Sequence, residues 1–179
     1  MRCWLTGLAM ALLALSAGSL PAAGQTAESG SGLDLPRYVS LKADRVNVRK
    51  GPGTDYPIAW VFERIGLPVE VIKEYESWRQ IRDSDGAEGW VLQNLLSARR
   101  TALVAPWEAR KAPAGKTLPV FEVRESASGS GGVVAKVEAG ALVSVLSCDR
   151  TWCLVSVSDQ RGYLEQAKLW GVYKDESLR

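Results

Sequence analysis

The chain has 179 residues, of which 46% are apolar and 23% are charged, and its 22 basic and 20 acidic side chains leave a net charge of +2. These proportions are typical of a folded protein and exclude a disordered or fibrous chain. The sequence contains no histidine, which removes the commonest general base and metal ligand and argues against an enzyme. The small net charge predicts no dominant attraction to nucleic acid.

The first 24 residues have the layout of a secretory signal peptide. A short basic start precedes an apolar run at residues 4–15, and residues 16–24 are rich in small side chains. This order predicts cleavage after Gly24 and a periplasmic or secreted protein with no membrane segment after cleavage. The alternative is an uncleaved membrane anchor, which is disfavoured because Gly18 and Pro21 interrupt a run that needs ~20 apolar residues.

The cysteines also indicate an oxidising compartment. Cleavage removes Cys3 and leaves Cys148 and Cys153, an even and closely spaced pair. In an exported chain such a pair predicts a disulfide, here across a tight hairpin. For a closed loop of about six residues, the chain-entropy model gives a stabilisation of ~2 kcal/mol. We interpret the pair as a structural staple rather than a redox switch.

An internal repeat sets the predicted architecture. Four landmarks recur in the same order, and they are Arg49, Gly66, Trp78 and Gly89 in one copy and Arg124, Gly140, Trp152 and Gly162 in the other. The intervals between them are 17, 12 and 11 residues in the first copy and 16, 12 and 10 in the second. This similarity indicates a tandem duplication rather than a long solenoid.

Each copy has the pattern of short strands. Val46 and Val48 alternate with polar residues, as do Val69 and Val71, and turn-forming stretches such as residues 51–53 separate the alternating runs. A sheet of about 60 residues leaves its edges exposed unless it curls on itself. The sequence therefore predicts an all-β protein with two tandem small β-barrels.

Several segments of the first copy resemble the bacterial SH3-like domain family. They are Val-Asn-Val-Arg-Lys-Gly-Pro-Gly-Thr-Asp-Tyr-Pro at residues 46–57 and the segments at residues 66–71, 78–81 and 88–91. The second copy resembles the Cys-x4-Cys form of the family, with Cys148 and Cys153, and the likeness covers most of residues 38–174. It departs from the pattern at residues 124–127, which lack the Gly-Pro-Gly turn, and at residues 106–119, which look like an insertion.

This resemblance implies an SH3-like barrel in each copy and a targeting or binding module for cell-wall glycopeptide or a protein partner, not an enzyme. The predicted organisation has six parts: a signal peptide (1–24), a flexible leader (25–36), a first SH3-like domain (37–98), a linker or insertion assigned either to the connection or to the second domain (99–118), a second SH3-like domain (119–174) and a tail (175–179).

The tryptophans are the candidate binding residues. On a strand, Trp78 lies on the face opposite Ile81, and Trp152 lies opposite Val155. If the aliphatic residues face the barrel interior, both indoles point to solvent and offer a platform for a sugar ring, a proline or a peptide backbone. The alternative is that the tryptophans fill the cores or the contact between the domains.

We therefore predict a non-catalytic exported module that recognises cell-wall peptidoglycan or a short peptide through an aromatic groove formed by Trp78, Tyr56, Tyr75 and Trp152. The alternative is a structural adaptor of the envelope, which contacts a partner protein through a loop or edge strand and buries its tryptophans between the domains. No catalytic residue, cofactor, metal or nucleic-acid partner is predicted, and the oligomeric state is left open. Asp83 and Asp85 are interpreted as turn residues rather than calcium ligands.

Overall fold

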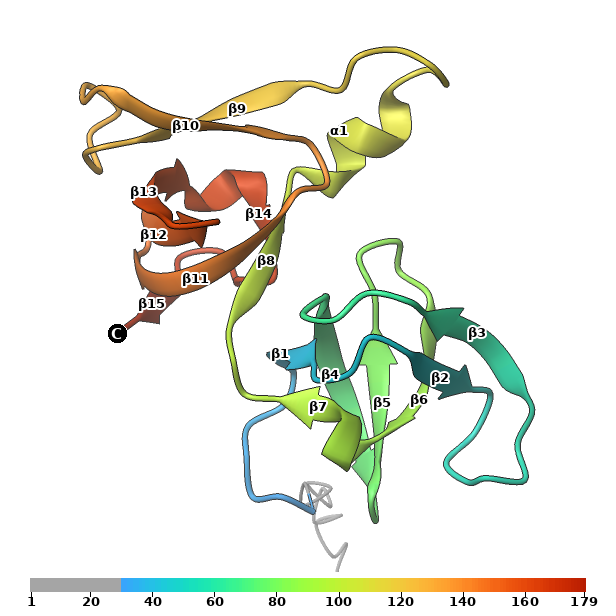
Figure 1. Cartoon of the computed structure of the whole chain (residues 1–179). Helices are drawn as coiled ribbons and strands as arrows, with labels where there is room; N and C mark the ends of the chain where they lie inside the picture. Colours follow the sequence, from blue (N-terminus) through green and yellow to red (C-terminus); the bar gives the residue numbers. More distant parts are fainter. Residues whose placement is uncertain (1–29) are drawn as a thin grey trace, which may run out of the picture.

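The computed structural model describes residues 30–179 as two small bodies, each built from one curled antiparallel sheet (Figure 1). The predicted signal peptide, Cys3 and most of the predicted leader lie outside the described residues. The prediction of an all-β protein is confirmed. Within residues 30–179, no helix has the length and apolar character needed to cross a membrane.

The first sheet forms barrel one and has the strand order β3-β2-β6-β5-β4-β1-β7. Its strands are β1 (Arg37–Leu41), β2 (Val46–Arg49), β3 (Ile58–Phe62), β4 (Pro68–Tyr75), β5 (Trp78–Arg82), β6 (Glu88–Leu92) and β7 (Leu96–Ser97), with the 3-10 helix η1 (Gln93–Leu95) before the last. The expected alternation holds, because Val46 and Val48 are fully buried and Asn47 is exposed. Ile81 and the valines of β4 and β6 complete this core.

The second sheet forms barrel two and has the order β10-β9-β13-β12-β11-β8-β14. Its strands are β8 (Thr101–Val104), β9 (Val120–Arg124), β10 (Val133–Glu138), β11 (Leu142–Asp149), β12 (Trp152–Val157), β13 (Gln160–Glu165) and β14 (Leu169–Trp170), with the 3-10 helix η2 (Gln166–Lys168) before the last. The two orders are equivalent, because each strand of the second sheet takes the place of the strand of the first sheet whose number is seven lower. The duplication inferred from four landmarks therefore extends to the whole topology.

In each barrel a glycine lets two neighbouring strands of the sheet approach closely, β2 and β6 in barrel one and β9 and β13 in barrel two. The two strands are joined by a single residue pair, Arg49 with Trp90 in barrel one and Arg124 with Tyr163 in barrel two. A Cβ atom on Gly89 would lie 2.4 Å from Val48 Cγ1, and one on Gly162 would lie 2.7 Å from the Arg124 carbonyl oxygen. Only glycine fits at these two positions.

The predicted disulfide is present in barrel two. Cys148 and Cys153 are bonded to each other and stand directly opposite on β11 and β12. Both are buried, and they belong to the same core as Val155 and Leu164. The pair thus joins the two central strands of the sheet inside the core, as expected of a structural staple.

Residues 99–118, for which the sequence left open the connection or the second domain, and the predicted tail both contain elements that pair with barrel two. Residues 99–118 contain β8, which pairs with β11, and the helix α1 (Pro106–Lys111). The predicted tail contains β15 (Ser177–Leu178), which pairs with the end of β11. The sequence pattern concealed these elements because β8 is buried along its whole length and does not alternate, while α1 and β15 are too short to show a period.

The two barrels contact each other through aromatic and polar side chains. Tyr38 of β1 packs against Trp170 and Tyr173, with ring centroids 5.3 and 4.7 Å apart. The Tyr173 hydroxyl donates a hydrogen bond of 3.0 Å to Glu70, which is 7% exposed and is also bonded by Arg82 at 3.0 Å. This buried carboxylate is therefore paired on both of its oxygens, as a buried charge must be.

We expect two phenols of this interface to ionise late in an alkaline titration. Burial and the charge of Glu70 raise the pKa of Tyr38 from 10.0 to about 12 and raise the pKa of Tyr173 as well. Because the folded state holds both phenols neutral, this stabilisation is complete below pH 10 and is lost as the pH rises through the raised values. The loss of this stabilisation can be measured by following phenolate absorbance and unfolding together above pH 10.

The variant Tyr173→Phe removes one of these phenols. It should reduce the late part of the titration, meaning the increase in phenolate absorbance that occurs well above pH 10. Tyr75→Phe is the matched control, since Tyr75 is 53% exposed on barrel one and should leave the late part in place. A late part that survives in a Tyr38→Phe, Tyr173→Phe double variant would contradict the assignment.

Candidate functional site

Three surface hollows meet at Trp152 among the described residues of barrel two. The loop hollow, of about 500 Å³, is lined by Arg150, Thr151, Trp152, Glu165, Gln166, Ala167, Leu169, Val172, Lys174 and Asp175. The C-terminal hollow, of about 510 Å³, lies toward Leu154, Tyr163 and the strand β15. The hairpin hollow, of about 340 Å³, lies between β9 and the end of β13. The half-buried Trp152 indole thus forms a wall common to all three.

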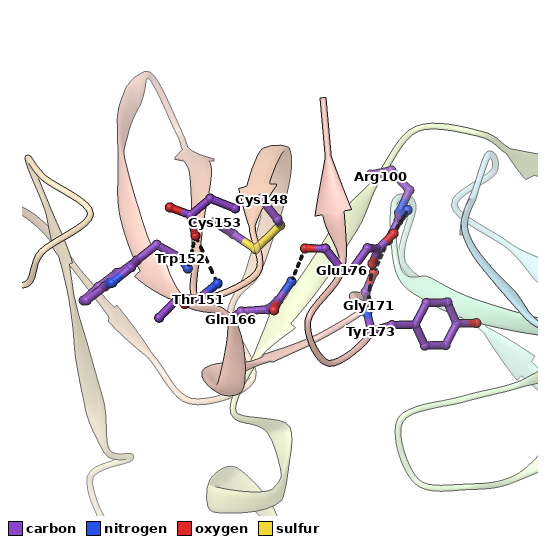
Figure 2. Close-up of a disulfide and its surroundings, with 10 residues drawn as sticks. Arg100, Cys148, Thr151, Trp152, Cys153, Gln166, Gly171, Tyr173 and Glu176 are labelled. Carbon is purple, nitrogen blue, oxygen red and sulfur yellow. Dashed lines mark hydrogen bonds and ion pairs between the residues drawn. A yellow bond between two sulfur atoms is a disulfide. The ribbon is translucent and has the colours of Figure 1, made fainter.

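The turn before β12 holds the backbone of Trp152 in place. Asp149 Oδ1 accepts hydrogen bonds from the backbone N–H groups of Thr151, at 3.0 Å, and Trp152, at 2.7 Å. These two bonds, the one from Trp152 first, lower the pKa of the Asp149 carboxyl, so it is ionised when it accepts them. Figure 2 shows the indole pointing away from the adjacent disulfide.

A loop after β14 forms the far wall of the loop hollow. Glu176 binds Arg100 at 2.8 and 3.0 Å and accepts the backbone N–H of Tyr173 at 2.8 Å. The Gln166 amide donates to the Glu176 carbonyl oxygen at 2.9 Å, as Figure 2 shows. Lys174 lies in this fixed loop and is exposed on the side of the hollow.

The loop hollow carries both signs of charge on its rim. Arg150 and Lys174 supply cations, and Glu165 and Asp175 supply carboxylates; all four side chains are exposed. An aromatic wall with opposite charges on its rim suits a short ligand that has both amino and carboxylate groups.

The hairpin hollow lies beside β9, the strand that follows a much longer connection than its equivalent in barrel one. Four residues (42–45) join β1 to β2, whereas fifteen residues (105–119) join β8 to β9. Val46 at the start of β2 is fully buried, but Phe121 at the equivalent position of β9 is only half-buried, and Val120 is 49% exposed. The β9–β10 hairpin stands away from β12 and β13 over most of its length (Figure 1).

A protein-family model described as "Bacterial SH3 domain" matches this chain over residues 42–98 and 120–171. The chain belongs to the bacterial SH3 domain family. The two matched segments correspond to barrel one and barrel two, so the resemblance noted in the sequence is confirmed for both copies.

A curated relative and two solved structures are similar to these tandem SH3 domains. "Putative N-acetylmuramoyl-L-alanine amidase YrvJ" of Bacillus subtilis (strain 168) is 27% identical over 124 residues, which cover 69% of this chain and 24% of that protein. This chain therefore spans about a quarter of the length of that relative. NlpC2 and NlpC1 from Trichomonas vaginalis are 12% and 13% identical, with a TM-score of 0.33 for each. These alignments cover 78% and 79% of this chain and 48% of each of those chains, and at this TM-score they support no conclusion.

The structure separates the four aromatic residues predicted to line one groove. Trp152 borders the hollows, but Trp78, its equivalent in the first SH3 domain, is 7% exposed, so the expectation of a solvent-facing indole there is wrong. Trp78 does lie on the face of β5 opposite Ile81, since Ile81 belongs to the core cluster and Trp78 does not. A side chain on the outward face of a strand is still buried where other parts of the chain cover that face.

The two tyrosines lie at different places in the first SH3 domain, Tyr56 in a loop and Tyr75 at the end of β4. Tyr56 packs on Gly51 and Gly53 of its own loop, while Tyr75 stands opposite Trp78 across the β4–β5 hairpin. Both remain exposed, and their role as ligand contacts stays a prediction. The sequence reasoning missed Lys174 and Gln166, because only the fold brings their segments beside Trp152.

Among the described residues, no group of three or more His, Cys, Asp or Glu side chains is placed to hold a metal ion. Asp83 accepts the backbone N–H groups of Asp85 and Ala87 at 2.9 and 2.8 Å, as a turn residue does. Asp85 binds Arg110 of α1 at 2.6 Å and so adds a second contact between the two SH3 domains.

We expect the wall of the loop hollow to weaken in acid. Burial alone raises the pKa of the Glu176 carboxyl, but hydrogen bonds from Arg100 and the Tyr173 backbone outweigh it and hold the pKa below 4.5. Since the folded pKa is lowered, the stabilisation is present above pH 4.5 and is lost as the pH falls through the folded value. Thermal unfolding of wild type and Glu176→Gln, measured from pH 7 downward, should show a difference in Tm that narrows in acid.

Glu165→Gln provides the control, because Glu165 is an exposed carboxylate on the rim of the same hollow. It should change Tm little at any of these pH values. A difference between wild type and Glu176→Gln that stays constant down to the lowest pH would contradict the role given to Glu176.

Proposed function

We propose that this chain is a non-catalytic, extracytoplasmic binding module that recognises cell-wall peptidoglycan through the hollows around Trp152 of its second SH3 domain. The observation that carries the proposal is the half-buried indole at which three hollows meet, with charges of both signs on the rim of the loop hollow. The bacterial SH3 domain family and the name of the relative, an N-acetylmuramoyl-L-alanine amidase, support a cell-wall ligand.

The chemistry of the chain supports binding without catalysis. The sequence has no histidine, and both cysteines of the described residues are joined in the disulfide. Neither a Cys–His nor a Ser–His pair is therefore available to activate a nucleophile. The buried disulfide and the predicted signal peptide support a place outside the cytoplasm.

In the proposed mechanism, Trp152 stacks on the ligand and excludes water from its apolar part. Arg150 and Lys174 pair with ligand carboxylates, and Glu165 and Asp175 pair with its amino groups. Because the disulfide, the Asp149 turn and the bonded Glu176 loop hold the backbone that carries these groups before binding, little backbone conformational entropy is lost on binding.

Retention on purified sacculi tests the proposal. Trp152→Ala should lower the affinity at least ten-fold relative to wild type, as expected when a central aromatic contact is truncated. Tyr75→Ala is the matched control, since it removes an exposed aromatic ring from the first SH3 domain. Unfolding curves of both variants establish that the fold is retained.

Equal retention of wild type and Trp152→Ala would contradict this site, and loss in Tyr75→Ala alone would move the site to the first SH3 domain. Competition separates the two parts of the ligand: a soluble stem peptide should release the protein, whereas peptide-free glycan strands should not.

A structural adaptor is the second candidate function, and the contact between the barrels favours it. Trp170 packs edge-on against Tyr38 at this contact, as the adaptor hypothesis requires for a tryptophan between the domains. Absence of wild-type retention on sacculi, together with capture of an envelope protein by a photocrosslinker at position 152, would select it.

A further inference from the structure

The carboxylate of Glu74 lies at one end of the first SH3 domain and has no exposed side-chain surface. Its Oε1 atom binds Arg37 Nη2 at 2.5 Å, Arg79 Nε at 3.1 Å and the Ser31 hydroxyl at 2.7 Å. Its Oε2 atom accepts the backbone N–H of Ser31 at 2.7 Å. Burial alone raises the pKa of this carboxyl, but the hydrogen bonds from Arg37 and Ser31 outweigh it, so Glu74 is a carboxylate at neutral pH.

The barrel itself holds the two arginines that flank Glu74. Arg79 stands opposite Glu74 on β5, is 4% exposed, and donates to the carbonyl oxygens of Glu76 and Trp78 at 2.9 and 2.8 Å. It also donates to the Gln93 side chain at 2.5 Å. Arg37 belongs to β1, which pairs with β4. The Glu74 clamp, formed by Glu74, Arg37 and Arg79, is thus built by the sheet and not by the segment that covers it.

Residues 30–34, here called the strap, cover the Glu74 clamp. All five are exposed, and Leu33 retains 57% of its accessible surface. Ser31 supplies two charge-assisted hydrogen bonds to Glu74, and Leu35 behind the strap packs on the core. The strap is therefore held by the Ser31 contacts and by a hydrogen bond of 3.4 Å that Arg37 donates to the Asp34 carbonyl oxygen, and it buries little apolar surface of its own.

An apolar hollow of about 290 Å³ continues from the Glu74 clamp along β1 and β7. Tyr38, Val39, Val71 and Leu96 contribute to its walls, and Leu33 of the strap lies at its edge. Leu33, two residues after Ser31, is the apolar residue that the strap places at this hollow. The volume of the hollow accepts a larger apolar side chain than Leu33.

We propose that the Glu74 clamp and this hollow form a peptide-binding site that the strap occupies in the structure. The ligand is an extended protein segment with a serine or threonine, whose N–H and hydroxyl groups replace those of Ser31, and a large apolar residue two positions later. The partner chemistry is taken from Ser31 and Leu33, which are seated on the site. This site lies in the first SH3 domain and shares no lining residue with the hollows at Trp152.

A labelled peptide with the sequence of residues 30–34 serves as the probe, and fluorescence polarisation measures its binding to the full chain. In wild type the strap competes at a high effective concentration, so binding is weak. Ser31→Pro removes both donors of the strap while leaving Glu74, Arg37 and Arg79 in place. This variant should bind the probe at least ten-fold more tightly than wild type.

A second probe with alanine in place of its serine is the matched control, and it should bind Ser31→Pro at least ten-fold more weakly than the first. This comparison uses one folded protein and so does not depend on a clamp variant being stable. Adding Glu74→Gln to Ser31→Pro should also abolish the preference for the serine probe. Equal binding of both probes, or equal binding of the serine probe to wild type and Ser31→Pro, would overturn the proposal.

Retention of Ser31→Pro on sacculi separates this inference from the proposed function. Ser31→Pro should be retained like wild type, because the clamp and Trp152 lie in different SH3 domains. Probe binding without sacculus retention would reject the cell-wall function and leave the peptide site standing, whereas retention without probe binding would reject the peptide site alone.

Discussion

In each sheet one hairpin, β2–β3 or β9–β10, is joined to the other strands by the close approach of two strands at Gly89 or Gly162. A side chain at either position would collide with the facing strand, and the single bridging pair beside it would be lost. The valine cores depend on this junction, because it holds the strands that carry Val46, Val48 and Val123 against the rest of each core. In the second domain, β9 diverges from β13 beyond the bridge at Arg124, and the hairpin hollow beside Trp152 opens there.

The contact between the domains and the candidate site share one loop. Tyr173 of this loop donates to the buried Glu70 of the first domain, and Glu176 of the same loop binds Arg100. Removing one partner from a buried charged contact costs more than the contact contributes, because the other group is left unpaired. The wall of the loop hollow therefore depends on the first SH3 domain being present, although the hollow lies on the second.

The features predicted correctly from the sequence depend on short-range patterns. These features are the alternation of Val46 and Val48, the recurring landmarks, and the spacing of Cys148 and Cys153. Each depends on residues that are neighbours within one hairpin or one repeat. Exposure of a tryptophan depends instead on what the rest of the chain places over it, so Trp78 and Trp152 differ although both lie opposite a core residue. Of the four residues predicted to line one aromatic groove, only Trp152 borders the three hollows of the second domain.

The sequence by itself determined the all-β character, the duplication, the family and the disulfide, because strand period and landmark spacing are properties of consecutive residues. Tertiary structure alone decided which copy presents an open aromatic surface and which carboxylates are clamped. One partner of each lies far away along the chain: Ser31 is 43 residues from Glu74, Arg100 is 76 from Glu176 and Tyr173 is 103 from Glu70. No local pattern encodes such pairs, since they form only when closure of the two sheets brings distant segments together.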